Sequence, residues 1–120
     1  MIKKIVVAGC RDYTDYESAK PKLDEIIAPI ASEHTVVIIS GDCRGADKLG
    51  ERYALENGFR IERHPADWDR HGRAAGPIRN REMAKVADYV ICFWDGKSRG
   101  TKTMIDYAKA EEKERYIILI

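Results

Sequence analysis

Residues 90–103 read Val-Ile-Cys-Phe-Trp-Asp-Gly-Lys-Ser-Arg-Gly-Thr-Lys-Thr, and the fold of the chain is organised around this stretch. Its apolar beginning, residues 90–94, predicts a buried strand. A loop with two glycines follows, and Thr101 opens a segment whose apolar residues recur at helical spacing. A strand, a glycine loop and a helix start can hold phosphate, because the first amides of a helix have no internal partners. The same pattern is also typical of an ordinary βα turn that binds nothing.

The composition limits the class of protein. The 120 residues include 21 basic and 20 acidic side chains, which gives a net charge of +1. From the length we expect one domain over residues 1–120. The near-zero net charge argues against a protein that coats nucleic acid or binds to a membrane surface. No apolar run approaches the roughly 20 residues that span a bilayer, and the N-terminus is too short for a signal peptide, so we expect a cytoplasmic protein. Three cysteines without CxxC spacing indicate neither a disulfide framework nor a metal site, and no cofactor is expected.

The periodicity predicts alternating strands and helices. Strands are expected at 4–8, 36–39, 59–63, 90–94 and 116–120, and helices at 15–31, from 46 to a cap at Gly58, at 78–87 and from 101. Residues 65–77 are expected to be the longest irregular piece. This (βα)₄β pattern predicts the α/β class, with a parallel sheet covered on both faces. Right-handed crossovers leave few topologies, of which we choose strand order 3-2-1-4-5.

This strand order predicts where a ligand would bind. Strands one and four become neighbours at the switch point, so the loops at 9–14 and 95–101 face each other across one crevice. The loops at 40–47 and 65–77 lie to one side. Glycines in these loops let the backbone approach an anion closely, and arginines can donate bidentate, charged hydrogen bonds to it. The predicted phosphate- and ligand-binding residues are Gly9, Arg11, Ser40, Gly41, Gly45, Asp47, Arg79, Asn80, Arg81, Gly96, Gly100 and Thr101.

Each of these assignments has a plainer alternative. Arg11 could pair with a surface carboxylate, and Asp47 could only offset the charge of a helix start. The loop at 40–47 matches neither GxGxxG nor GxxxxGK[ST], which argues against a standard NAD dehydrogenase or P-loop ATPase. Residues 60–81 hold six arginines around Trp68, which is available for stacking on a base, although a solvated basic surface has the same composition. Trp94 is the second stacking candidate, although a tryptophan at a strand end is more often part of the core.

Several segments of the chain together resemble one known family. They are Gly-Cys-Arg-Asp at 9–12, Ser-Gly-Asp-Cys-Arg-Gly-Ala-Asp at 40–47, Gly-Pro-Ile-Arg-Asn-Arg-Glu-Met at 76–83, Ala-Asp at 87–88, and the stretch from Phe93-Trp94-Asp95-Gly96 through Gly100-Thr101. They are similar to the YspA-like branch of the SLOG superfamily. That superfamily groups Rossmann-like proteins related to the "lonely guy" phosphoribohydrolases and the Smf/DprA DNA-processing proteins. The resemblance implies the same sheet order and a site for nucleotides or nucleotide-derived ligands.

The chain departs from the related phosphoribohydrolases at one position. Those enzymes carry a catalytic glutamate two residues after a glycine-rich P-G-G-x-G-T run, and the matching residue here is Thr103. Cleavage of an N-glycosidic bond passes through an oxocarbenium-like state that a nearby carboxylate stabilises. Asp47, Glu82 or Asp95 could supply that carboxylate from another loop, and no spacing selects among them.

Three functions therefore follow from the sequence as hypotheses. The first is binding or sensing of a nucleotide-like small molecule, the second is hydrolysis of an N-glycosidic or phosphoester bond, and the third is binding of single-stranded nucleic acid. The near-zero net charge argues against nucleic acid as the partner. Related folds often form homodimers, which makes a homo-oligomer a further expectation by analogy.

Overall fold

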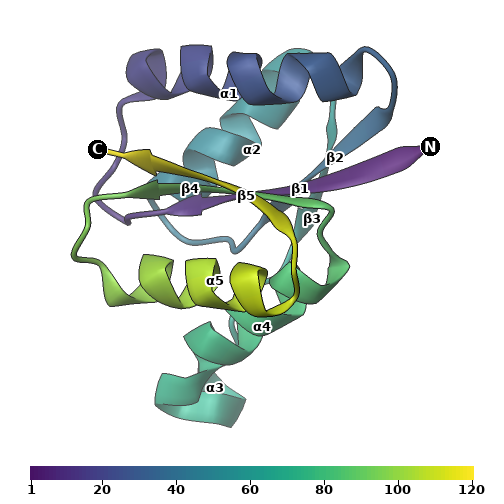
Figure 1. Ribbon diagram of the computed structural model, residues 1–120. Helices are drawn as coiled ribbons and strands as arrows, with labels where there is room; N and C mark the ends of the chain where they lie inside the picture. Colours follow the sequence, from purple (N-terminus) through teal and green to yellow (C-terminus); the bar gives the residue numbers. More distant parts are fainter.

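A computed structural model describes all 120 residues, and Figure 1 shows strands and helices alternating along the chain. In chain order the elements are β1 (Ile2–Gly9), α1 (Tyr16–Ala31), β2 (Thr35–Ser40), α2 (Ala46–Asn57), β3 (Arg60–Arg63), α3 (Trp68–His71), a 3₁₀ turn η1 (Gly72–Ala74), α4 (Ala75–Val86), β4 (Tyr89–Trp94), α5 (Arg99–Ala110) and β5 (Glu114–Leu119).

The five strands form one parallel sheet in the order β3-β2-β1-β4-β5. This confirms the predicted α/β class and the predicted strand order. Helices α1 and α2 cover one face of the sheet, and α4 and α5 cover the other, with the short α3 projecting beyond them (Figure 1). Gly9, at the end of β1, lies opposite Phe93 in β4, so the loops that follow these two strands leave the sheet side by side.

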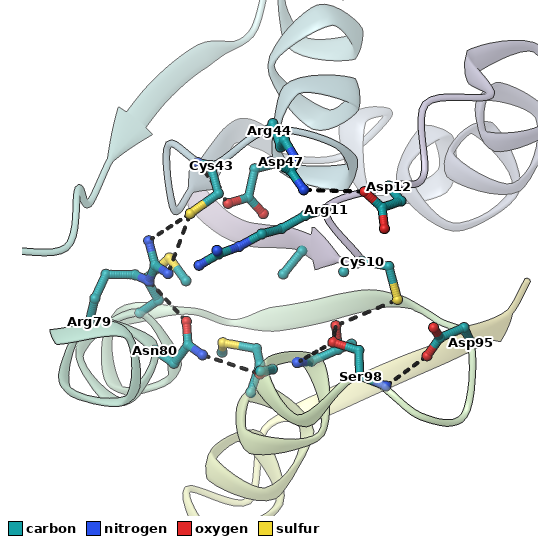
Figure 2. A pocket seen from close by; sticks show the side chains of 16 residues that line it. Cys10, Arg11, Asp12, Cys43, Arg44, Asp47, Arg79, Asn80, Asp95 and Ser98 are labelled. Carbon is teal, nitrogen blue, oxygen red and sulfur yellow. Dashed lines mark hydrogen bonds and ion pairs between the residues drawn. The ribbon is translucent and has the colours of Figure 1, made fainter. Parts of the chain in front are cut away.

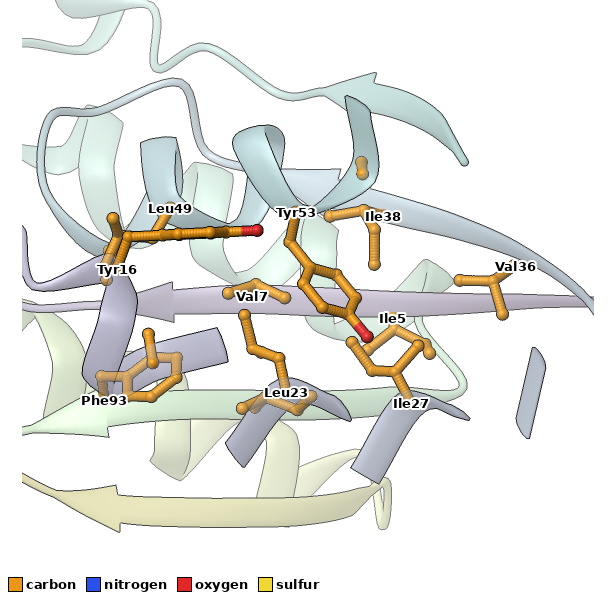
Figure 3. Close-up of a cluster of buried hydrophobic side chains, with 14 residues drawn as sticks. Ile5, Val7, Tyr16, Leu23, Ile27, Val36, Ile38, Leu49, Tyr53 and Phe93 are labelled. Carbon is orange, nitrogen blue, oxygen red and sulfur yellow. The ribbon is translucent and has the colours of Figure 1, made fainter. Parts of the chain in front are cut away.

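Each face of the sheet has its own hydrophobic core because side chains alternate along a strand. Ile5 and Val7 of β1 belong to the core under α1 and α2, which is drawn in Figure 3, whereas Val6 and Ala8 belong to the core under α4 and α5. A strand buried on both faces needs an uninterrupted apolar run, which β1 and β4 both have. Burial on both faces holds β1 and β4 in place, and the loops that follow these two strands border the candidate functional site.

The structure corrects the sequence prediction at four places. Residues 65–77 are not wholly irregular, since α3, η1 and the first turn of α4 lie there; Asp67 begins α3 by accepting a hydrogen bond from the amide of Arg70. Helix α4 therefore begins ahead of Pro77, which lies in its first turn, where no amide partner is lost. Helix α5 begins at Arg99 rather than at Thr101, because the Ser98 side chain caps it. Strand β5 starts and ends slightly earlier than expected.

None of the helices has both the length and the apolar character needed to cross a membrane. The cytoplasmic location and the homo-oligomer stay predictions.

Candidate functional site

A pocket of about 380 Å³ opens at the carboxyl ends of β1 and β4, the position expected for a ligand of an open parallel sheet. We call it the switch-point pocket. Four segments contribute to it: the end of β1 with the loop after it, the loop before α2 with the start of that helix, the middle of α4, and the loop before α5 with its first turns. The lining residues are Ala8, Gly9, Cys10, Arg11, Asp12, Cys43, Arg44, Asp47, Arg79, Asn80, Met83, Asp95, Ser98, Gly100, Thr101 and Met104.

Two glycines allow the backbone segments around the pocket to meet. Gly9 has φ +153°, and a Cβ there would overlap the backbone of Phe93. Gly45 has φ +79°, and its Cβ would overlap the backbone of Arg11. The amide of Cys10 donates to the Phe93 carbonyl oxygen at 3.0 Å, and the Cys10 carbonyl oxygen accepts from the Ala46 amide at 3.2 Å. At the floor of the pocket, the backbone that follows β1 is therefore joined to β4 on one side and to the start of α2 on the other.

The start of α5 forms one wall and offers backbone donors. Asp95 Oδ1 accepts from the amides of Lys97 and Ser98, each at 2.8 Å, and these hydrogen bonds hold the pKa of Asp95 below its usual value. The Ser98 hydroxyl in turn accepts from the amide and the hydroxyl of Thr101. The amide of Gly100 donates to no protein atom, so it is one of the free helix-start donors next to the pocket.

Arg79 and Asn80 tie α4 to the loops on either side of it. The Arg79 side chain is buried, with the residue only 7% exposed, and it donates to the carbonyl oxygens of Gly41 and His64 and, at 2.9 Å, to Asn80 Oδ1. Asn80 Nδ2 donates to the Gly100 carbonyl oxygen at 3.3 Å. Both Nη atoms of Arg79 also donate to Cys43 Sγ, each at 3.7 Å. No carboxylate is among these acceptors, so a buried positive charge without an ion pair lies at the wall of the pocket.

Asp47, in the first turn of α2, is the most deeply buried carboxylate of the pocket, at 6% exposure. Its Oδ2 accepts from the Cys43 amide at 3.1 Å, and Oδ1 has no donor in the protein. Burial raises the pKa of Asp47 to about 6, and the Cys43 amide and the charge of Arg79 limit that rise. At neutral pH the pocket thus contains an ionised carboxylate with one oxygen available to a ligand.

The remaining arginines of the pocket differ in their partners. Arg44 pairs with Asp12 at 3.3 Å at the exposed rim. Arg11 is exposed at the end of β1 and has no hydrogen-bond or ion-pair partner, and Figure 2 shows its side chain extended across the pocket toward Cys43 and Arg79. Arg11 is therefore the guanidinium free to meet an anion.

The structure brings together seven of the twelve residues predicted to bind phosphate or ligand, namely Gly9, Arg11, Asp47, Arg79, Asn80, Gly100 and Thr101. Five others lie outside the lining. Ser40 is fully buried, and its hydroxyl donates to Glu51 at 2.6 Å. Gly41 lies behind the pocket against Arg79 and Asp47, and Gly45 supports the floor as described above. Arg81 and Gly96 are exposed away from the pocket.

The two tryptophans predicted to stack on a base do not line the pocket either. Trp68 lies on α3, is 49% exposed and packs near Gly76. Trp94 Nε1 donates to the Ser98 carbonyl oxygen at 3.0 Å, so its ring braces the loop before α5. Among the three candidate carboxylates, Asp47 and Asp95 line the pocket and Glu82 is exposed outside it.

Sequence reasoning did not select several polar residues of the pocket: Cys10, Asp12, Cys43, Arg44 and Ser98. For Ser98 there was a signal, because a serine three residues ahead of a helical position is a common capping residue. The others lie inside loops already chosen for their glycines and arginines. Only the course of each loop determines which of its side chains face the pocket.

Comparisons with known proteins agree with this architecture. DNA processing protein A (DprA) from Streptococcus pneumoniae has a similar fold, with a TM-score of 0.74 over 98% of this chain and 21% identity. The present chain spans 50% of that DprA chain, so the likeness concerns the fold. The Gene 61 protein of Mycobacterium phage D29 is 34% identical in an alignment of 108 residues that covers 84% of each protein. The model of the YspA, cpYpsA-related SLOG family matches residues 3–71. The chain therefore belongs to the YspA, cpYpsA-related SLOG family, as the motifs of its loops implied.

Proposed function

We propose that residues 1–120 form a single domain that binds a nucleotide or nucleotide-derived ligand in the switch-point pocket. The observation that carries this proposal is the unpaired guanidinium of Arg11 lying across a pocket whose opposite wall is the start of α5. A phosphate group there would receive charged hydrogen bonds from Arg11 and a backbone hydrogen bond from Gly100. Membership of the SLOG family supports a nucleotide-related ligand.

The charge balance of the pocket supports a ligand with few negative charges. Arg44 and Asp12 pair at the rim, and the charges of Arg79 and Asp47 offset each other at the inner wall. Asp95, the third carboxylate of the lining, is held by the amides of Lys97 and Ser98, so Arg11 is the one guanidinium without a partner in the protein, and the three arginines and three aspartates of the lining carry no net charge. One phosphate, or a diphosphate partly in solvent, suits this arrangement better than a polyanion.

Calorimetric titration with AMP, ADP-ribose, NAD and a cyclic nucleotide tests the proposal. We expect saturable binding of at least one of them, weakened by Arg11→Ala by about 1–3 kcal/mol. Arg81→Ala is the matched control, because Arg81 is exposed outside the pocket and its loss should leave the affinity unchanged. If no nucleotide binds, or if the two substitutions have equal effects, the proposed site is wrong.

Asp47 favours a second function, hydrolysis of the N-glycosidic bond of a nucleotide. Thr103 occupies the position of the glutamate of the related hydrolases, and its hydroxyl donates to the Arg99 carbonyl oxygen within the helix. Asp95 is held by two backbone amides, which leaves Asp47 as the buried carboxylate of the pocket with a free oxygen. In such a reaction Asp47 would accept a proton from water as the water attacks C1′, and the departing base would leave with the bonding pair and take up a proton from solvent.

Chromatography of nucleoside monophosphates after incubation separates the two functions. If the wild-type protein releases free base and Asp47→Asn does not, the result supports hydrolysis. Binding without release would leave the chain as a binding protein.

The third hypothesis, single-stranded nucleic acid, would use exposed arginines of residues 60–81 and Trp68. Fluorescence anisotropy with labelled single-stranded DNA tests it. We expect weak affinity that falls steeply with salt, because the net charge is +1. Tight binding at physiological salt would make nucleic acid the leading candidate.

A further inference from the structure

Asp47 is an unusual residue for the wall of an anion-binding pocket. An ionised carboxylate only accepts hydrogen bonds, so it repels phosphate and requires donors from the ligand. The Cys43 amide fixes Oδ2, which leaves Oδ1 as the acceptor that no protein group satisfies. Only 6% of the residue is exposed, and Oδ1 keeps contact with the solvent of the pocket. A bound molecule that displaces this solvent has to supply a hydrogen-bond donor in its place.

The position of Asp47 indicates which part of a nucleotide it meets. Asp47 begins α2, which follows β2, whereas the Gly100 amide begins α5, which follows β4. Strand β1 lies between β2 and β4, so the two helix starts are separated by about two strand spacings, roughly 10 Å. In Figure 2, Asp47 and Ser98 lie on opposite sides of the pocket. In a nucleotide the group that follows the phosphate directly is the ribose, and its hydroxyl groups are donors.

We infer that Asp47 accepts hydrogen bonds from the ribose hydroxyl groups of the ligand, so that the pocket selects ribonucleotides over 2′-deoxyribonucleotides. This inference rests on the proposed function, because it takes the phosphate to lie at the start of α5. It adds the ligand class, namely a nucleotide with a free 2′,3′-diol. A site built to hydrogen-bond a hydroxyl rejects the analogue that lacks it, because a buried acceptor is then left unpaired.

The surroundings of Asp47 suit this role. Arg79 Nη1 and Asp47 Oδ2 both approach Gly41, where a Cβ would come within 2.8 Å of each atom. The absence of a side chain at Gly41 thus lets a buried guanidinium lie near the carboxylate without forming an ion pair. Arg79 supports the ionised form of Asp47, while its own hydrogen bonds go to carbonyl and amide oxygens and to the Cys43 sulfur, none of them in a carboxylate. The free oxygen of Asp47 is therefore not taken up by an internal cation.

The test compares AMP with 2′-deoxy-AMP and 3′-deoxy-AMP by calorimetry on wild type and Asp47→Asn. We expect wild type to prefer AMP over 2′-deoxy-AMP by about 10- to 100-fold, the range for a hydrogen bond to a charged group. Asp47→Asn keeps an oxygen for the Cys43 amide but loses the charge, so it should bind AMP and 2′-deoxy-AMP with nearly equal affinity. Asp69→Asn, on the exposed α3, is the control and should keep the wild-type preference.

The outcomes distinguish this inference from the proposed function. Equal affinity of wild type for ribo- and deoxyribonucleotides, with both weakened by Arg11→Ala, would overturn the role of Asp47 and leave nucleotide binding in place. A preference for one base that persists in its deoxynucleotide and disappears in Asp47→Asn would mean that the carboxylate contacts the base, which also overturns the inference. If no nucleotide binds, both the role of Asp47 and the proposed nucleotide-binding function are wrong. Thermal unfolding of Asp47→Asn shows whether the variant is folded.

Discussion

Gly9 and Phe93 lie opposite each other in the β1–β4 register, and the backbone of Gly9 is so close to Phe93 that a Cβ would overlap the Phe93 carbonyl oxygen. The same oxygen accepts the amide of Cys10 at 3.0 Å. This contact joins the ends of β1 and β4, from which two loops of the switch-point pocket begin. It depends on a residue without a side chain.

Gly9→Ala should therefore lower the free energy of unfolding by about 2–4 kcal/mol, because the new methyl group meets rigid backbone at a positive φ. Chemical denaturation measures this. Gly100→Ala is the control: no atom lies within 4 Å of its Cβ position and it lies in α5, so stability should stay the same or rise by up to about 1 kcal/mol. A loss of stability at Gly100 equal to that at Gly9 would contradict the explanation.

Asp47 should make the protein less stable as the pH rises from 4 to 6. Its pKa is about 6 in the folded chain and 3.8 in the unfolded chain, so in this window the unfolded state releases the proton first and is favoured. The loss amounts to roughly 3 kcal/mol and is complete above pH 6 to 7. Comparing the pH dependence of stability in wild type and Asp47→Asn isolates this contribution from other carboxylates.

At pH 7 Asp47→Asn should be the more stable protein, and the difference should shrink toward pH 4. Asp69→Asn should follow the wild-type curve. A difference between wild type and Asp47→Asn that does not change with pH would show that the carboxyl group is not destabilised by burial.

Ser40→Ala should reduce stability without reducing nucleotide affinity. The buried hydroxyl donates to Glu51 at 2.6 Å and accepts from the Asp42 amide at 3.1 Å, and it does not line the pocket. Removing it takes one hydrogen bond from the buried Glu51 carboxylate and one from the Asp42 amide, at a cost of about 1–3 kcal/mol. Ser18→Ala, at an exposed position of α1, should have little effect. Loss of nucleotide affinity in a folded Ser40→Ala protein would return Ser40 to the binding site.

Cys43 should be the thiol that reacts in the native protein. It is partly exposed at the pocket, whereas Cys10 and Cys92 are buried, and burial raises the pKa of Cys92 to about 12. Iodoacetamide followed by mass spectrometry should modify one of the three cysteines quickly, and Cys43→Ser should abolish this fast phase. A nucleotide bound in the switch-point pocket should slow the modification, since Cys43 lines the pocket. Modification at an unchanged rate under saturating nucleotide would place the ligand elsewhere.

The sequence by itself determined the architecture of this protein. Uninterrupted apolar runs in β1 and β4 require strands that are buried on both faces. Between such runs the apolar residues recur at helical spacing, which requires helices that connect parallel strands as crossovers. Few topologies satisfy both. It also located the loops of the pocket, because parallel strands deliver their loops to one edge of the sheet. Glycines, being a local signal, further marked the loops that precede α2 and α5.

Only the tertiary structure decided which side chains of those loops face the pocket. Ser40, Arg81, Glu82 and Trp68 carry suitable chemistry, but they point into the core or out to solvent. A side chain's direction depends on the course of its loop and on contacts with residues far away in the sequence, such as those that Arg79 makes with Gly41 and His64. The burial of Asp47, and with it the rise of its pKa, arises in the same way, because the loop before α2 and Arg79 of α4 come together around it.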